Sequence, residues 1–106
     1  MAERFGPDRV YLEKEAEAEY LEASQAYASE SQTLADDFEK EVRWGATFIA
    51  ENPEAAPLVE GTRVRRKVLR RFPYSLFYAI EGERIHIVAV AHGKRRHGYW
   101  LDRLGS

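Results

Sequence analysis

Apolar residues in the first half of the chain recur at helical spacing. From about Lys14 to Ser29 the alanines and tyrosines follow one another every three or four residues, which places them on one face of a helix. A second stripe with the same spacing begins after Ser29–Ser31, where Ser31 or Thr33 can cap a new helix. The two stripes are Ala16, Tyr20, Ala23 and Tyr27, and Leu34, Phe38, Val42, Ala46 and Ile49. Asn52-Pro53 ends the second helix, because proline disfavours helical angles at the residue before it. The pattern predicts two antiparallel helices with a short connection.

The second half of the chain is rich in β-branched and aromatic residues. We expect strands over Thr62–Phe72, Ser75–Ile80 and Arg84–Ala91, with Pro73 breaking or bending the chain after the first. The connection Glu81-Gly82-Glu83 is short and contains glycine, which is typical of a hairpin. Helices followed by strands predict an α+β domain.

Alternation along the last expected strand predicts where that strand lies in the sheet. Ile85 and Ile87 fall on one face, and Val88 and Val90 fall on the other. A strand with apolar residues on both faces is expected to be an inner strand that is partly covered on both sides.

Short segments near the two ends of the chain complete the expected fold. Arg9–Leu12 follows the turn signal Gly6-Pro7 and is expected to form an edge strand. At the other end, Tyr99, Trp100 and Leu101 are expected to pack back onto the sheet as a final turn of helix.

Composition narrows the functional classes. A chain of 106 residues with 44% hydrophobic positions predicts one domain, residues 1–106, with a core of about 9–103. The absence of cysteine excludes disulfides, cysteine zinc sites and cysteine nucleophiles. A signal-peptide pattern is missing, and no apolar run approaches the roughly 18 residues of a membrane span. We therefore expect a cytoplasmic protein that does not enter a membrane.

Charge is divided unevenly along the chain. The formal net charge is −2, which alone argues against a nucleic-acid binder, but residues 1–60 carry −10 and residues 61–106 carry +8. Six of the basic residues lie in the first expected strand, where alternation puts Arg63, Arg65, Lys67 and Arg71 on one side and Arg66 and Arg70 on the other. Cations spaced about 7 Å apart along a strand permit serial phosphate contacts. Alternatively, these residues pair with the glutamate-rich helices 13–22 and 36–41.

A second basic cluster follows the last strand. Lys94, Arg95 and Arg96 stand between His92 and His97, with Tyr99 and Trp100 beyond. Arginine to hold phosphate, histidine or tyrosine to move a proton, and an aromatic ring to stack on a base are what metal-independent RNA cleavage requires. The alternative is that His92 and His97 are hydrogen-bonded structural residues, and packing is the expected role of His86. The spacing of the three histidines matches no metal motif, so we expect neither a metal nor another cofactor.

An ordered set of motifs resembles the RelE/ParE superfamily of bacterial toxins. The set consists of the segments Ile49–Pro57, Arg70–Tyr78 and Ile85–Arg96, followed by Tyr99-Trp100. The resemblance spans roughly residues 9–103. It implies an N-terminal short strand and a two-helix hairpin packed on a three- to four-stranded antiparallel sheet, with a short C-terminal helical turn. It also implies a cytoplasmic toxin that is neutralised by a small antitoxin and serves in plasmid stabilisation.

The superfamily includes two modes of action, which make different residues important. RelE-like members cleave messenger RNA on the ribosome, and the positions that match their cationic strand and late cluster are Arg65, Lys67, Arg71, Arg95 and Tyr99. ParE-like members block DNA gyrase without nuclease chemistry. The stretches Phe72-Pro73-Tyr74 and His92–Arg96 are closer to the ParE-like branch. The acidic helix pair also makes the chain less basic than a ribosome-binding toxin.

The resemblance therefore favours a ParE-like toxin that binds a target such as gyrase. The expected target-binding residues are Arg63, Arg65, Arg70, Arg71, Lys94, Arg95, Arg96 and Trp100. The alternatives are a ribosome-dependent endoribonuclease that acts on messenger RNA and an inactive family member that serves as a binding module. The antitoxin is expected to lay an apolar, acidic segment along either the helix pair or the basic face of the sheet.

Overall fold

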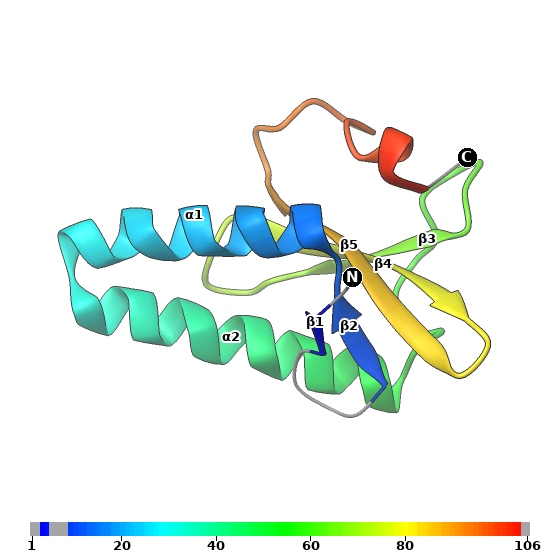
Figure 1. Ribbon diagram of the computed structural model, residues 1–106, viewed down its shortest axis with the longest axis horizontal. Coiled ribbons are helices and arrows are strands. Elements are labelled where there is room, and N and C mark those ends of the chain that lie inside the picture. Colours follow the sequence, from blue (N-terminus) through cyan, green and yellow to red (C-terminus); the bar gives the residue numbers. More distant parts are fainter. Residues whose placement is uncertain (1–2, 5–8, 105–106) are drawn as a thin grey trace.

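A helical hairpin covers one face of a mixed sheet, and the C-terminal segment lies over the other face (Figure 1). This computed structural model describes residues 3–4 and 9–104. The helices are α1 (Lys14–Glu30) and α2 (Gln32–Glu51), and the chain ends in the 3-10 helix η1 (Leu101–Leu104). The strands are β1 (Glu3–Arg4), β2 (Val10–Leu12), β3 (Val64–Val68), β4 (Tyr74–Glu81) and β5 (Arg84–His92). The α+β fold predicted from the sequence is confirmed.

The helical hairpin forms as the apolar stripes predict. Ser31 alone separates the helices, and its side chain accepts a hydrogen bond from the backbone N–H of Leu34 at 3.3 Å, so it caps α2. Phe38, at the centre of the second stripe, is fully buried and stacks with Tyr20 of α1 at 5.8 Å between ring centroids. Within the described residues, no helix combines the length and the apolar character needed to cross a membrane.

The sheet has the order β1-β2-β5-β4-β3, and one of its pairings differs from the expectation. β2 pairs with β5 in parallel, with Val10 opposite Ile85, so the sheet is mixed and not antiparallel throughout. β2 is also not at the edge, because β1 pairs along its outer side. Local patterns do not reveal this arrangement, because it joins the beginning of the chain to its last strand.

β5 contains a β-bulge, and because of it the predicted face of Val90 is wrong. Phe77 pairs with Ala89 but Tyr78 pairs with Ile87, so Val88 is an extra residue that shifts the alternation. Val90 therefore lies in the helix-side core with Ile85 and Ile87, and not on the face of Val88 as predicted. The expectation of an inner strand covered on both faces is confirmed, because both core clusters take residues from β5.

The strand expected over Thr62–Phe72 is shorter than predicted. β3 ends at Val68, and the backbone N–H groups of Arg70 and Arg71 donate to the Glu41 carboxylate of α2 instead of to another strand. Arg70 and Arg71 consequently lie in the turn that leads to Pro73, and strand alternation does not decide their directions.

Candidate target-binding site

The face of the sheet opposite the helices carries a cavity of about 200 Å³. Its floor is formed by β3, β4 and β5, and its wall by the segment that follows β5. The lining residues are Arg66, Ser75, Phe77, Ala91, His92, Gly93, Arg95, Arg96, His97, Gly98, Tyr99 and Trp100. Three guanidinium groups are among them, whereas no described lining residue is a carboxylate. The cavity is therefore suited to an anionic or hydrogen-bond-accepting group of a partner.

Trp100 fixes the wall of the cavity to the floor. Its side chain is buried and packs on Phe77 of β4, with 5.0 Å between the ring centroids. The Arg66 guanidinium of β3 lies over the Phe77 ring, 5.9 Å from its centroid, and donates a hydrogen bond to the Ser75 hydroxyl at 3.0 Å. The prediction that the tail packs back on the sheet is confirmed for Tyr99 and Trp100, whereas Leu101 is exposed and begins the final helical turn, η1. Trp100, which was predicted to bind the target, is itself part of the core.

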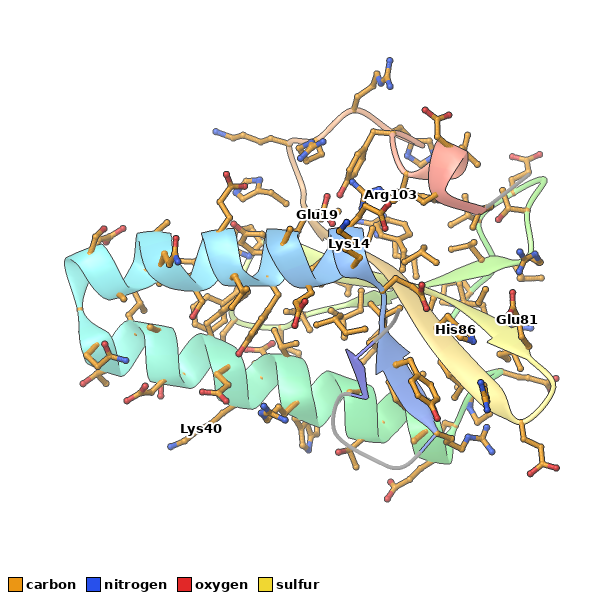
Figure 2. All side chains as sticks on the ribbon, viewed as in Figure 1. Lys14, Glu19, Lys40, Glu81, His86 and Arg103 are labelled. Atoms are coloured by element: carbon orange, nitrogen blue, oxygen red, sulfur yellow. The ribbon has the colours of Figure 1, made fainter. Side chains whose placement is uncertain are left out.

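Glu19 of α1 binds the C-terminal segment through its carboxylate (Figure 2). Its carboxylate accepts hydrogen bonds from the Tyr99 hydroxyl at 2.6 Å and from both Nη atoms of Arg103 at 2.9 and 3.0 Å. It also accepts the backbone N–H of Val90 at 2.9 Å, next to the β5 bulge and beyond the end of the pairing with β2. One carboxylate therefore joins α1, β5 and the tail.

Tyr99 and Arg95 are engaged with each other and with Glu19. The Arg95 guanidinium lies 3.9 Å from the centroid of the Tyr99 ring and 3.9 Å from the Glu19 carboxylate. Burial, followed by the hydrogen bond to Glu19, raises the pKa of the Tyr99 hydroxyl above its ordinary value. A hydroxyl that donates to a carboxylate and resists ionisation is poorly suited to accept a proton near neutral pH.

Two cations of this wall, Lys94 and Arg96, differ from Arg95 in having no acidic partner among the described residues. Neither Lys94 nor Arg96 makes an ion pair with any described residue, and both side chains are exposed. The backbone N–H of Lys94 donates to the His92 ring at 3.0 Å, and that ring packs edge-on against Tyr74. His92 is therefore a hydrogen-bonded, packed residue, as in the structural alternative, whereas His97 is exposed at the cavity.

The strand cations predicted with Arg95 and Tyr99 lie on the helix side of the sheet. Arg65 pairs with Tyr78 in the sheet register, and its Nη1 donates to the carbonyls of Glu54 and Ala56 at 3.0 and 2.8 Å. Lys67 lies over the Phe48 ring of α2 at 4.3 Å. Of the five residues predicted for RNA cleavage, the structure brings together only Arg95 and Tyr99.

The remaining predicted residues are dispersed over the surface. Arg63 forms an ion pair with Glu81 at 3.3 Å at the hairpin end of the sheet. Arg71 pairs with Asp37 of α2 at 3.4 Å, so the alternative of pairing with an acidic helix holds for this residue. The Arg70 side chain is exposed.

Two residues of the site were absent from the predicted set. Arg66 was placed by alternation on the face of Val64, which is the face of the cavity, and that signal could have identified it. Glu19 gave no such signal, because its partners lie 71 to 84 residues away in the chain.

His86 is held by neighbouring side chains. His86 lies between two carboxylates, with Nδ1 2.6 Å from Glu13 and Nε2 3.5 Å from Glu81, and its ring stacks on Tyr11 (Figure 2). Among residues 3–4 and 9–104, no three histidine, aspartate or glutamate side chains are grouped in a way that could hold a metal ion.

Residues 10–97 match the model of a family described as the ParE toxin of the type II toxin–antitoxin system parDE. The chain belongs to this ParE toxin family. It is therefore a toxin of the type II toxin–antitoxin class and a member of the RelE/ParE superfamily, as its motifs predict, and an antitoxin partner is implied.

A solved structure has the same fold as this ParE-family toxin. The match is to a chain of a chromosomal ParDE toxin–antitoxin system from P. aeruginosa, with a TM-score of 0.67 and 19% sequence identity. It covers 76% of the toxin and 90% of the other chain. No curated protein sequence matches this chain.

Proposed function

We propose that this ParE-family toxin stops growth by binding a cellular target, with DNA gyrase as the candidate, and not by cleaving RNA. One observation carries the proposal: Tyr99 and Arg95, candidates for proton transfer and charge stabilisation, are engaged within the molecule, while neighbouring cations are exposed and make no ion pair with a described residue. Tyr99 and Arg95 contact Glu19, whereas Lys94 and Arg96 have no acidic partner among the described residues. Exposed cations next to a cavity that accepts anions can bind a negatively charged surface, and this binding requires no chemical step.

The contact surface in this proposal is the wall that follows β5, together with Arg66 beneath it. Trp100 and Glu19 position the wall, so its cations are presented from a fixed backbone and not from a mobile tail. Arg65 lies on the helix side of β3, Arg63 directly before β3, and Arg70 and Arg71 in the turn after it. These four residues remain predicted contacts of a larger target surface.

A supercoiling assay with purified toxin and gyrase tests this proposal. We expect inhibition by the unmodified toxin, and we expect Lys94→Ala combined with Arg96→Ala to require about 10-fold more protein for the same effect, since two contacting charges contribute up to about 1 kcal/mol each. The matched control is Lys14→Ala combined with Arg84→Ala, which removes two exposed cations elsewhere. Unaltered supercoiling at a large excess of toxin would contradict gyrase as the target.

The ribosome-dependent endoribonuclease is the second candidate, and one observation favours it. The cavity places Arg66, Arg95, His97 and Tyr99 around a space of about 200 Å³, which is where a phosphodiester could lie. Primer-extension mapping of transcripts after induced expression separates the two functions. Codon-phased cuts that disappear in an Arg95→Ala, Tyr99→Phe variant would establish cleavage, whereas intact transcripts with an early fall in DNA synthesis support target binding. If neither growth arrest nor target binding is found, the chain is a binding module.

A further inference from the structure

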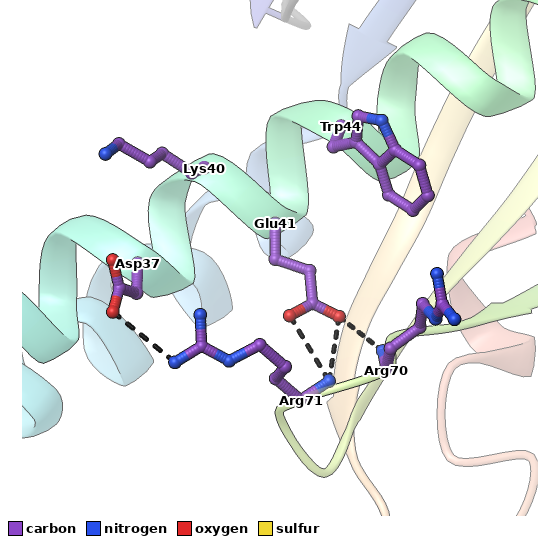
Figure 3. A pocket seen from close by; sticks show the side chains of 6 residues that line it. All are labelled: Asp37, Lys40, Glu41, Trp44, Arg70 and Arg71. Atoms are coloured by element: carbon purple, nitrogen blue, oxygen red, sulfur yellow. Dashed lines mark hydrogen bonds and ion pairs between the residues drawn. The ribbon is translucent and has the colours of Figure 1, made fainter.

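A second cavity, of about 540 Å³, lies between α2 and the turn after β3 (Figure 3). Asp37, Lys40, Glu41 and Trp44 of α2 line one side, and Arg70 and Arg71 of the turn line the other. We call these six residues the Trp44 groove. It shares no lining residue with the cavity on the opposite face of the sheet.

Internal contacts hold the two sides of the Trp44 groove together. The Glu41 carboxylate accepts the backbone N–H groups of Arg70 and Arg71, and the Arg71 guanidinium donates to Asp37 at 3.4 Å (Figure 3). The Glu41 carboxylate is therefore bound by backbone N–H groups, and the Asp37 carboxylate is bound by the Arg71 guanidinium. The walls are formed in advance, which lowers the entropy cost of binding a partner there.

The side chains of Trp44, Lys40 and Arg70 are not among those held by these internal contacts. The Trp44 side chain is 53% exposed, and the Lys40 ammonium and the Arg70 guanidinium make no ion pair with any described residue. Figure 3 shows Lys40 and Arg70 extending away from the Glu41 contact, with Trp44 on the same helix. An exposed indole flanked by two free cations offers an apolar anchor and two sites for carboxylates.

The chemistry of the occupant follows from these three groups. An apolar side chain would cover the indole, and acidic residues near it would meet Lys40 and Arg70. The other exposed large apolar side chains in the described chain are aliphatic, namely Leu21, Leu58, Val68 and Leu101. On the opposite face, the aromatic anchor Trp100 is already buried by the toxin's own sheet. The Trp44 groove therefore fits an acidic, amphipathic peptide segment better than the basic face of the sheet does.

We propose that the Trp44 groove is the docking site for an acidic, amphipathic segment of the antitoxin. The expected surfaces for that partner are the helix pair and the basic face of the sheet, and the exposed Trp44 indole, with Lys40 and Arg70 beside it, favours the helix side. The proposal rests on membership of the toxin–antitoxin class and is independent of whether the target is gyrase. The exposed cations Lys94 and Arg96 of the proposed target contact follow β5 on the other face, whereas Arg70 and Arg71, which remain predicted contacts of a larger target surface, line the Trp44 groove.

Affinity measurements with the antitoxin of the same gene pair test this proposal. We expect Trp44→Ala to weaken binding at least about 30-fold, as the loss of a central aromatic anchor does. Combining Lys40→Glu with Arg70→Glu should weaken binding by about 10-fold or more at low salt and less at high salt, because the partner is acidic. Leu21→Ala and Lys14→Glu are matched controls, since they alter an exposed apolar residue and an exposed cation outside the groove.

The indole signals of ¹⁵N-labelled toxin locate the antitoxin independently of the variants. The chain has two tryptophans, of which Trp44 is exposed and Trp100 is 1% exposed. Unlabelled antitoxin should shift the Trp44 indole N–H signal and leave that of Trp100 nearly unchanged. An unshifted Trp44 signal in the complex, or unchanged affinity of the Trp44→Ala toxin, would overturn the proposal.

Growth assays distinguish a failure of this proposal from a failure of the proposed function. Without antitoxin, the Trp44→Ala toxin should arrest growth as the unmodified toxin does, because the proposed target contacts are intact. With antitoxin, it should escape neutralisation. Loss of arrest together with unchanged antitoxin affinity would show that the groove binds the target and would refute the docking proposal.

Discussion

Replacing Glu19 by alanine tests whether one carboxylate holds the C-terminal segment in place. The side chain is 12% exposed and accepts four hydrogen bonds, from Tyr99, Val90 and both Nη atoms of Arg103. Removing it leaves the Arg103 guanidinium, which is 19% exposed, without its carboxylate. Breaking a buried ion pair costs about 3–5 kcal/mol, and an exposed pair costs less than about 1 kcal/mol. Because this pair is mostly but not wholly buried, we expect a loss of about 3 kcal/mol.

Chemical unfolding and hydrogen exchange measure this effect. A loss of about 3 kcal/mol corresponds to a fall in the melting temperature of roughly 10 to 20 °C for a domain of this size. The backbone N–H of Val90 should exchange faster, because its acceptor is removed. Glu22→Ala is the control, since this exposed residue of α1 should change stability by less than about 0.5 kcal/mol. If both variants unfold at the same denaturant concentration, Glu19 does not have the role assigned to it.

Two further outcomes follow from the fold. Burial raises the pKa of Tyr99 above its ordinary value of 10.0. The contribution of the protonated Tyr99 hydroxyl to the free energy of unfolding is therefore complete below pH 10 and is lost as the pH rises above 10. Unfolding curves at alkaline pH should therefore show a smaller decline for Tyr99→Phe, by up to about 1.4 kcal/mol per pH unit, and an unchanged decline would contradict this assignment. Ser31→Ala removes the cap of α2 and should lower the free energy of unfolding by about 1 kcal/mol, whereas Ser29→Ala serves as the comparison on the last turn of α1.

Local patterns predicted the elements of this fold and failed where distant contacts decide the outcome. The stripe through Ala16 and Ala23 identified α1 correctly, because helical spacing is a property of neighbouring residues. The alternation of β5 failed at Val88, where a bulge shifts every later side chain to the other face. β3 was predicted too long because the sequence does not show that Glu41 takes the N–H groups of the following turn.

The candidate site was predictable in part for the same reason. The late cluster of Arg95 and Tyr99 is contiguous in the chain and was identified. Its combination with Arg65 and Lys67 assumed that those residues share a face with the cluster. The sheet register places them on the helix side and places Arg66 at the cavity. The site therefore depended on one choice of strand face, which the run of basic residues left open.

The parallel pairing of β2 with β5 has a consequence for the synthesis of this toxin. Val10 and Ile85, which face each other across the pairing, are 75 residues apart in the chain. At about 5–20 residues per second, the ribosome needs roughly 4 to 15 s to make the strand that β2 awaits. During that interval the helical hairpin can form, but its apolar face has no sheet to cover it. The pairing of β2 with β5 therefore cannot form until the last strand has left the ribosome.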